Sequence, residues 1–187
     1  MRFKKLFQPI KVGSMEIRNR LVVPPMGTNH ANDDSSVSQH MIDYYTERAK
    51  GGFGLITIEV TAVDPTGKAI IREPGLWYDE QIEGYRKLAD SIHAYGAKMS
   101  VQLHHAGRQT VGAFIDGKQP IAPSSIPCPY CQEVPKEMTT AEVYDMIQKF
   151  IDAAERAKKA GADAVEVHGA HGYLVAQFMS SYSNRRV

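Results

Sequence analysis

The sequence has few cysteines, little net charge and no long apolar run. Two cysteines in 187 residues cannot build a disulfide framework, which indicates a reducing, cytoplasmic setting. A formal net charge of +1 favours neither nucleic acid nor a membrane as a partner. No window is apolar over the ~18 residues that a membrane span needs. The basic start of the chain reaches Gln8 and Pro9 before any apolar run, so we expect no signal peptide.

The length and the absence of any linker indicate one substantial core rather than two large domains. One pattern occurs three times: an amphipathic helix, a glycine stop and a short apolar strand. In the clearest copy, Thr139 and Glu142 form a capping-box pair and Gly161 ends the helix before a strand over residues 164–167. The other two copies run over residues 38–60 and 82–103.

Strands that alternate with helices predict right-handed βαβ units and a parallel sheet. A further strand over residues 21–23 precedes the first helix, which gives four strands in all. Ahead of them, residues 9–12 and 15–17 flank Gly13-Ser14, a two-residue turn that predicts a hairpin. The predicted fold class is therefore α/β with a leading β-hairpin.

Polar residues follow each predicted strand at its C-terminal side. They include Thr28 after the first strand, Glu59, Gln102 with His104 and His105, and His168 with His171 and Tyr173. Ligands of parallel α/β folds bind at the carboxyl ends of the strands. The stretch over residues 104–138 is too long for a simple connection, which indicates a lid or a binding loop. We therefore expect a single active face.

His168, His171 and Tyr173 give the sharpest functional signal. Two imidazoles at a turn can hydrogen-bond a carbonyl or nitro oxygen, and a phenol with a pKa near ~10 can supply a proton. The same residues are also compatible with structural histidines or with half of a zinc site, and the turn supplies no third zinc ligand. Spacing alone does not favour a catalytic role over a structural role for these three residues.

Other candidates are weaker when taken singly. Residues 24–27, Pro-Pro-Met-Gly, either end a strand or let a flat ring approach the backbone closely. Gln102 offers an amide that both donates and accepts, which matches a pyrimidine-like edge. Cys128 and Cys131 lie in the long loop without the context of a redox or zinc site, so we interpret them as incidental thiols.

In combination, the motifs resemble the flavin-dependent Old Yellow Enzyme family of NADH:flavin oxidoreductases. They are most similar to its branch of 2-enoate reductases, NADH oxidases and bile-acid-dienoate reductases. The segments that carry the resemblance, in the family's order, are Asn19–Asn29, Gly54–Glu59, Val101–Arg108, Val165–Tyr173, Gln177–Ser180 and Asn184–Arg186.

The resemblance implies a TIM (β/α)8 barrel that carries FMN and transfers hydride from NAD(P)H to an activated C=C bond of an enone or enoate. It implies cofactor contacts by Pro25, Met26, Gly27, Val60, Gln102 and His168, oxygen binding by His168 and His171, and protonation by Tyr173. An iron–sulfur cluster and FAD are implied only for longer forms.

Four predicted strands are half of the eight that such a barrel needs. The resemblance therefore implies that residues 1–187 form the N-terminal portion of the barrel, about four βα units. The FMN phosphate would be held by loops after strands 7 and 8, outside this sequence. We expect self-association or a complementary half-barrel partner. The alternatives to an ene-reductase are a non-catalytic half-barrel and an FMN-dependent NADH oxidase.

Overall fold

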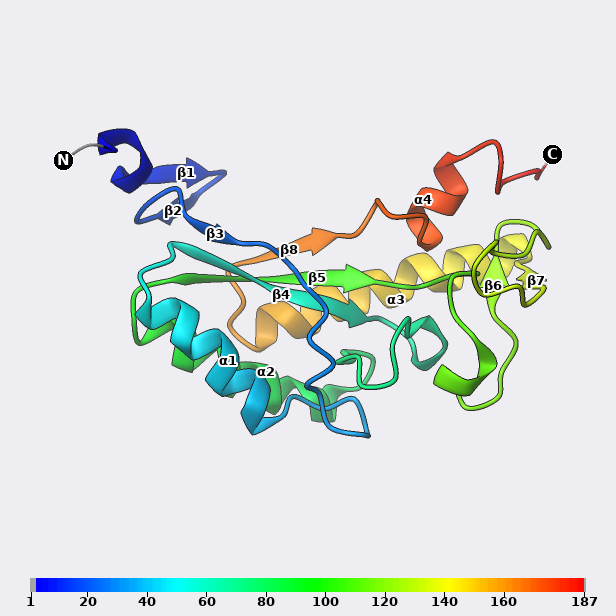
Figure 1. The fold of residues 1–187 in the computed structure, drawn as a ribbon, viewed down its shortest axis with the longest axis horizontal. Helices are drawn as coiled ribbons and strands as arrows, with labels where there is room; N and C mark the ends of the chain where they lie inside the picture. The colour runs from blue at the N-terminus through cyan, green and yellow to red at the C-terminus, as the bar shows by residue number, and fades with distance from the viewer. Residues whose placement is uncertain (1–2, 187) are drawn as a thin grey trace.

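A computed structural model describes residues 3–186. The basic start of the chain, for which we expect no signal peptide, therefore lies partly outside the described residues. Its centre is a four-stranded parallel sheet in the order β3-β4-β5-β8 (Figure 1). The strands are β3 (Val22–Val23), β4 (Leu55–Ala62), β5 (Lys98–His104) and β8 (Ala164–Val167). Their order and direction confirm the predicted succession of βα units.

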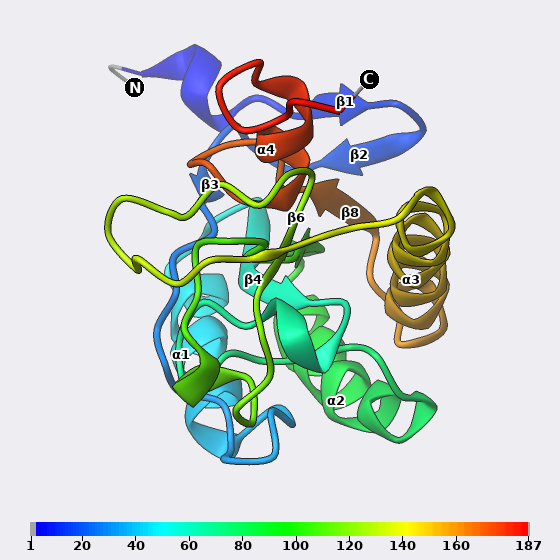
Figure 2. The same cartoon turned by 90° about the vertical axis from the view of Figure 1, so that its right-hand side faces the viewer.

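Three helices cover one face of this sheet: α1 (Gln39–Lys50), α2 (Ile82–His93) and α3 (Thr140–Lys159) (Figure 2). Neighbouring helices contact each other along the face, α1 with α2 and α2 with α3. Their buried side chains meet those of alternate strand residues, including Ile56, Ile58, Met99, Val101 and Leu103. The sheet face away from the helices therefore carries the remaining strand side chains.

The predicted helix ends are confirmed by their hydrogen bonds. The Ser38 side chain accepts from the backbone N–H of Met41 at the start of α1. Thr139 and Glu142 form both halves of a capping box at the start of α3. Gly161 follows α3 with a φ of 93°, the left-handed conformation that ends helices and that glycine adopts without strain.

The predicted hairpin is formed by β1 (Ile10–Val12) and β2 (Met15–Ile17), after a 3-10 turn η1 (Lys4–Phe7). Arg18, directly after β2, fastens it to the rest of the molecule. Its guanidinium donates to the carbonyls of Ala49, Phe53 and Tyr95. One side chain thus joins the hairpin to the C-terminal ends of α1 and α2.

The connections contain short elements that the sequence pattern did not predict. The 3-10 turns η2 (Pro65–Gly67) and η3 (Asp79–Gln81) lie between β4 and α2. In the long loop after β5 lie η4 (Gly112–Phe114) and a parallel pair, β6 (Ile121–Ala122) and β7 (Lys136–Glu137). A last helix, α4 (Leu174–Met179), follows the turn after β8.

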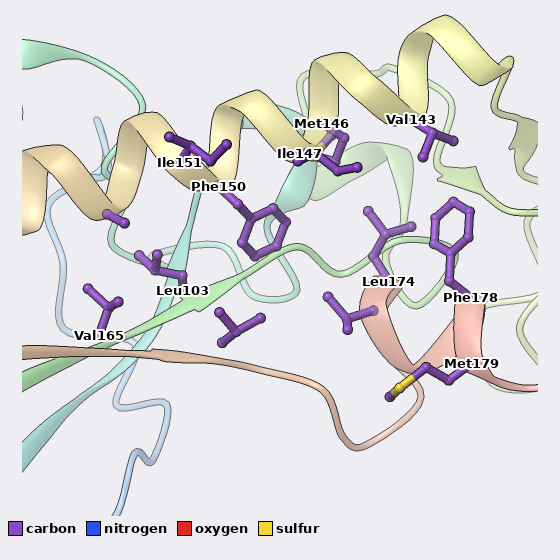
Figure 3. A pocket seen from close by; sticks show the side chains of 13 residues that line it. Leu103, Val143, Met146, Ile147, Phe150, Ile151, Val165, Leu174, Phe178 and Met179 are labelled. Carbon is purple, nitrogen blue, oxygen red and sulfur yellow. The ribbon is translucent and has the colours of Figure 1, made fainter. Parts of the chain in front are cut away.

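An apolar groove of about 570 Å³ lies beside β8, between α3 and α4 (Figure 3). Val165 and Val167 point into it from β8, and Ile147 and Ile151 from α3. These four side chains are between 40% and 56% exposed. Within the described residues β8 pairs with β5 alone, so its other edge is free to hydrogen-bond.

Candidate active site

The C-terminal ends of β5 and β8 lie side by side and position His168, His171 and Tyr173. Beyond β8, the backbone N–H of His168 donates to the carbonyl of Leu103, which continues the ladder with β5. The N–H of Leu174 then donates to the carbonyl of His105. The turn between them is therefore fixed against the end of β5, and it carries the residues with the sharpest sequence signal.

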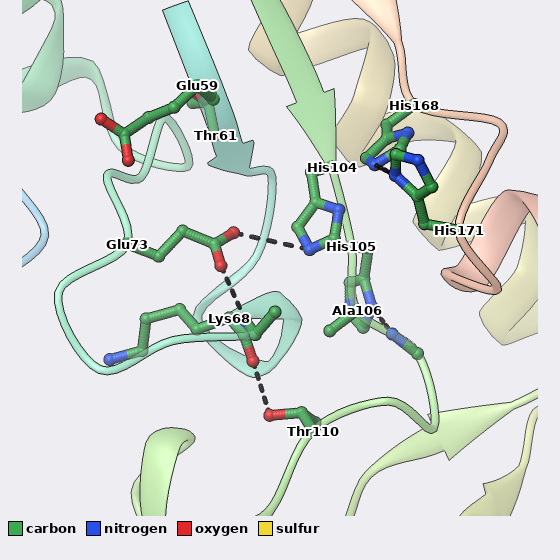
Figure 4. A network of polar contacts seen from close by, with 12 residues as sticks. Glu59, Thr61, Lys68, Glu73, His104, His105, Ala106, Thr110, His168 and His171 are labelled. Carbon is green, nitrogen blue, oxygen red and sulfur yellow. Dashed lines mark hydrogen bonds and ion pairs between the residues drawn. The ribbon is translucent and has the colours of Figure 1, made fainter. Parts of the chain in front are cut away.

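His168 and His171 lie together in this turn (Figure 4). His171 Nδ1 is 3.3 Å from His168 Nε2, and His171 adopts a left-handed φ of 55° in the turn. Burial and the neighbouring His171 lower the pKa of His168, so its ring is neutral near pH 7. Two nitrogens this close can both donate to a single oxygen placed ~3 Å from each.

Tyr173 lies beside the two histidines. Its ring centroid is 5.1 Å from that of His168 and 6.5 Å from that of His171. Burial, above all, raises the pKa of the Tyr173 phenol, while a hydrogen bond with the Gln109 side chain lowers it. The phenol is therefore protonated at neutral pH, and the hydrogen bond stabilises its anion. Gln109 lies in the irregular loop after β5, where no periodic pattern distinguishes it.

Hydrogen bonds from Thr28 to the buried Glu59 carboxyl fix the segment Pro24–Thr28. The N–H of Thr28 donates to Glu59 Oε2 at 2.5 Å, and the Thr28 hydroxyl donates to Oε1 at 2.6 Å. The hydroxyl of Tyr45 on α1 donates to the same carboxyl at 3.2 Å. The expectation that Glu59 ends a strand at the active face is therefore wrong: β4 continues to Ala62, and Glu59 is fully buried behind the segment.

With the segment fixed in this way, Gly27 lies against an apolar wall. A Cβ at Gly27 would be 3.5 Å from Ile70 Cδ1 and 3.8 Å from Val60 Cγ2. Met26 beside it is 53% exposed. The structure thus places Gly27 beside Val60, two residues that the resemblance implies as cofactor contacts, and adds Ile70 to them.

Gln102 points toward the sheet face that lacks helices, where its Nε2 donates to Glu166 Oε1 at 2.5 Å. The two residues are register partners on β5 and β8. Gln102 is 5% exposed, so its amide is held in one orientation by the carboxylate. Glu166 was not identified from the sequence, although it lies on β8 only two residues before His168.

Cys128 and Cys131 are free thiols, Cys128 buried and Cys131 partly buried. Burial and the neighbouring Cys128 raise the pKa of Cys131 to about 11, so its sulfur is protonated at neutral pH and is a poor nucleophile or metal ligand. Within residues 3–186, no group of three or more His, Cys, Asp or Glu side chains is arranged to hold a metal ion. In the same range no helix has the length and apolar character to cross a membrane.

Comparison with known proteins identifies the family. A family model described as NADH:flavin oxidoreductase / NADH oxidase matches residues 5–187. The chain belongs to this family. It is 52% identical over 186 residues to the NADH oxidase of Thermoanaerobacter brockii, and 43% identical over 183 residues to the NADPH dehydrogenase of Bacillus pumilus. These matches cover 99% and 97% of this chain.

The fold agrees with that of Old Yellow Enzyme from Pichia sp. AKU4542, with a TM-score of 0.90 at 32% identity over 98% of this chain. The match covers 50% of that chain, and the sequence matches cover 29% of the NADH oxidase and 53% of the NADPH dehydrogenase. The chain therefore spans about half of these relatives or less. Its fold is the N-terminal half of a TIM barrel, which confirms the predicted fold class and family.

Proposed function

We propose that this chain is the N-terminal part of an FMN-binding barrel that reduces an activated C=C bond of an enone or enoate with electrons from NAD(P)H. The observation that carries the proposal is the convergence of His168, His171 and Tyr173 at the mouth of a half-barrel from this family. Two imidazoles beside a protonated phenol suit a substrate that needs its oxygen polarised and its carbon protonated.

The residues at the mouth fit a flat flavin ring. Pro25, Met26, Gly27 and Val60 offer an apolar surface, and Gln102 and His168 offer polar groups for the ring's edge. Bound FMN supplies two-electron chemistry between NAD(P)H and an activated alkene. The proposal places any iron–sulfur cluster or FAD beyond these 187 residues.

The chain's own groups have separate tasks in this reaction. His168 and His171 donate hydrogen bonds to the electron-withdrawing oxygen of the substrate and so increase the electrophilic character of its double bond. The Tyr173 hydroxyl gives its proton to the substrate's α-carbon. The hydrogen bond from Gln109 then stabilises the phenolate oxygen until a proton returns from solvent.

The test is a comparison of Tyr173→Phe with the parent chain, each co-expressed with the second half of the Bacillus pumilus NADPH dehydrogenase and mixed with FMN. Flavin fluorescence quenching measures binding, and anaerobic loss of 2-cyclohexenone with NADPH or NADH measures reduction. We expect unchanged FMN affinity and a loss of enone reduction by ~10²–10⁴-fold, the usual contribution of a general acid. Equal turnover by both proteins would refute the role of Tyr173.

A second candidate is an FMN-dependent NADH oxidase, favoured by the 52% identity to a protein with that name. Oxygen needs no α-carbon proton donor of this kind, so Tyr173→Phe would leave aerobic NADH consumption unchanged. Oxygen uptake by the parent chain without any anaerobic enone reduction would favour this candidate.

We also propose that the groove beside β8 receives a complementary half-barrel, with a parallel strand on β8 and a helix against α3. The free strand edge, the apolar side chains of the groove and the coverage of about half of the relatives support this partner. Co-expression with the second half of the Bacillus pumilus NADPH dehydrogenase should give a one-to-one complex in sizing chromatography. A homodimer that excludes the added half would instead support self-association.

The two free cysteines support a cytoplasmic location.

A further inference from the structure

Beneath the His168 turn lie a buried acid and a buried imidazole to which neither the resemblance nor the proposed reaction gives a role. Glu73, in the connection between β4 and α2, and His104, the last residue of β5, are both fully buried. Glu73 Oε1 lies 3.6 Å from His104 Nε2. Figure 4 shows the His104 ring between the Glu73 carboxyl and the rings of His168 and His171.

These two side chains contain all the buried side-chain nitrogen and oxygen atoms that lack a hydrogen-bond partner within the described residues. The atoms are Glu73 Oε1 and both ring nitrogens of His104. The other carboxyl oxygen, Glu73 Oε2, accepts from the N–H of Ala69 at 2.7 Å, which fixes the carboxyl group in place. Buried polar atoms are costly without partners, so the two that face each other are expected to share a proton.

The position of that proton follows from the surroundings. Burial raises the pKa of Glu73 well above its usual value and lowers that of His104, so both groups favour their neutral forms. Glu59 and Lys68 act on Glu73 with opposite signs, and His105 and His168 further disfavour a charge on His104. A neutral pair has the Glu73 hydroxyl donating to His104 Nε2, which leaves the ring proton on Nδ1.

His104 also packs directly against Tyr173. The two ring centroids are 4.3 Å apart and the rings are perpendicular, at 89°, so the edge of one ring meets the face of the other. His104 is 5.6 Å from His168 by the same measure. The Tyr173 ring is thus supported by His104, while its hydroxyl is held by Gln109.

We propose that Glu73 and His104 form a neutral, hydrogen-bonded pair that positions Tyr173 for proton transfer. The inference rests on the proposed role of Tyr173 and adds two positioning residues to it. Neutrality matters because an ionised Glu73 would act on Tyr173 through space and make its phenol a weaker acid. Glu73 therefore fixes the His104 ring without placing a negative charge behind the proton donor.

The test uses the 187-residue chain labelled with ¹⁵N-histidine and ¹³Cζ-tyrosine. NMR should show His104 neutral with its proton on Nδ1 between about pH 5.5 and 8. Glu73→Gln keeps a neutral donor to Nε2, so the titration of Tyr173 should stay unchanged. His104→Leu should shift both the Tyr173 resonance and its pKa, whereas His40→Leu, in the His30–His40 stack, should change neither.

A stability cycle gives an independent readout. Glu73→Leu or His104→Leu leaves one buried polar partner alone, and each should raise the equilibrium constant for unfolding by ~10-fold. The double variant removes both polar groups, so it should raise that constant by less than the product of the single effects. Additive effects would overturn the hydrogen-bonded pair.

The outcomes separate this inference from the proposed function. An imidazolium at His104, a ring proton on Nε2 alone, or a fall in the pKa of Tyr173 by ~1 unit or more in Glu73→Gln would overturn the neutral pair. A Tyr173 resonance that ignores His104→Leu would overturn the positioning role. Undiminished enone reduction by Tyr173→Phe would remove the proposed reaction while leaving the NMR results intact.

Discussion

Thr28 and Glu59 show how a single hydrogen-bonded carboxyl fixes the segment at the barrel mouth. Thr28→Val removes one of the two Thr28 donors from the fully buried Glu59 carboxyl. We expect a loss of about 1 kcal/mol in the free energy of unfolding, because Glu59 Oε1 loses one of its two donors and keeps only the hydroxyl of Tyr45. Thr28→Ser keeps the hydroxyl and is the matched control. In urea titrations the serine variant should unfold at a higher denaturant concentration than the valine variant. Equal midpoints would contradict the hydrogen bond from the Thr28 hydroxyl to Glu59.

His105 gives a pH dependence of stability with a defined sign. Burial lowers the pKa of His105 to about 4 in the folded chain, against ~6.5 when unfolded. Its stabilising contribution is complete above pH ~6.5 and is lost as the pH falls toward 4, by at most ~1.4 kcal/mol per pH unit. His105→Asn removes this proton linkage, so its unfolding free energy should fall less steeply between pH 6.5 and 4.5.

The comparison of the two proteins isolates His105 from other buried groups. Burial raises the pKa values of Glu59 and Glu73, and their contributions have the opposite sign because the fold retains their protons. They contribute to both proteins and so cancel in the difference. Parallel stability curves for parent and variant would show that His105 is not buried in its neutral form.

Residue spacing predicted the site only where the local structure is regular. His168, His171 and Tyr173 follow directly from the end of β8, so their grouping could be predicted. Glu59 could not be placed, because the register of β4 and β5 shifts between Ile58 and Thr61 and alters which side a residue faces. Glu73 and Gln109 lie in irregular connections that no periodic pattern describes.

The start of α3 allows a prediction for a whole element. The Thr139 hydroxyl accepts from the N–H of Glu142 at 3.2 Å, and the Glu142 carboxylate accepts from the N–H of Thr139 at 2.8 Å. Thr139→Ala should lower the unfolding free energy by about 1 kcal/mol, whereas Thr139→Ser should leave it nearly unchanged. Chemical denaturation followed by far-UV circular dichroism measures both, and an alanine variant as stable as serine would show that the cap is dispensable.

The junction of the hairpin with β4 depends on Gly54. A Cβ there would lie 2.6 Å from Asn19 Oδ1 and 2.8 Å from Ile17 Cγ2, and hydrogen bonds to Leu21 and Lys98 hold the backbone on both sides. Gly54→Ala should destabilise the chain by about 1–3 kcal/mol, through overpacking. A Cβ at Gly13 would meet open space, so Gly13→Ala tests only the φ of 59° and should lower the unfolding free energy by less than Gly54→Ala does. Thermal melts of the two variants measure the difference. The reverse order would contradict the packing at Gly54.

The main helices and strands were predictable because caps, glycine stops and apolar periodicity coincide in them. The pair β6 and β7 was not predictable, since each strand has two residues and depends on contacts across the long loop. The 3-10 turns have the same limitation. Local signals suffice for elements of several turns, and shorter elements follow from the tertiary fold.

At the scale of the whole molecule, the groove beside β8 leads to a prediction about association. Ile151→Lys places a charge in the apolar groove, whereas Gln148→Lys adds the same charge to an exposed position on α3. We expect Ile151→Lys to bind less of a dye that reports exposed apolar surface and to lose the one-to-one complex with the complementary half. Gln148→Lys should retain both. Equal complex formation by the two variants would place the partner elsewhere.

The contacts of Arg18 also carry a consequence for synthesis on the ribosome. The side chain that fastens the hairpin needs the carbonyl of Tyr95, which is translated 77 residues later. At ~5–20 residues per second, the nascent chain carries an undocked N-terminus for at least several seconds. During that interval Phe3, Phe7 and Val12, which remain largely exposed even in the folded chain, are open to chaperones. The hairpin thus reaches its final place only after the chain has been made as far as Tyr95.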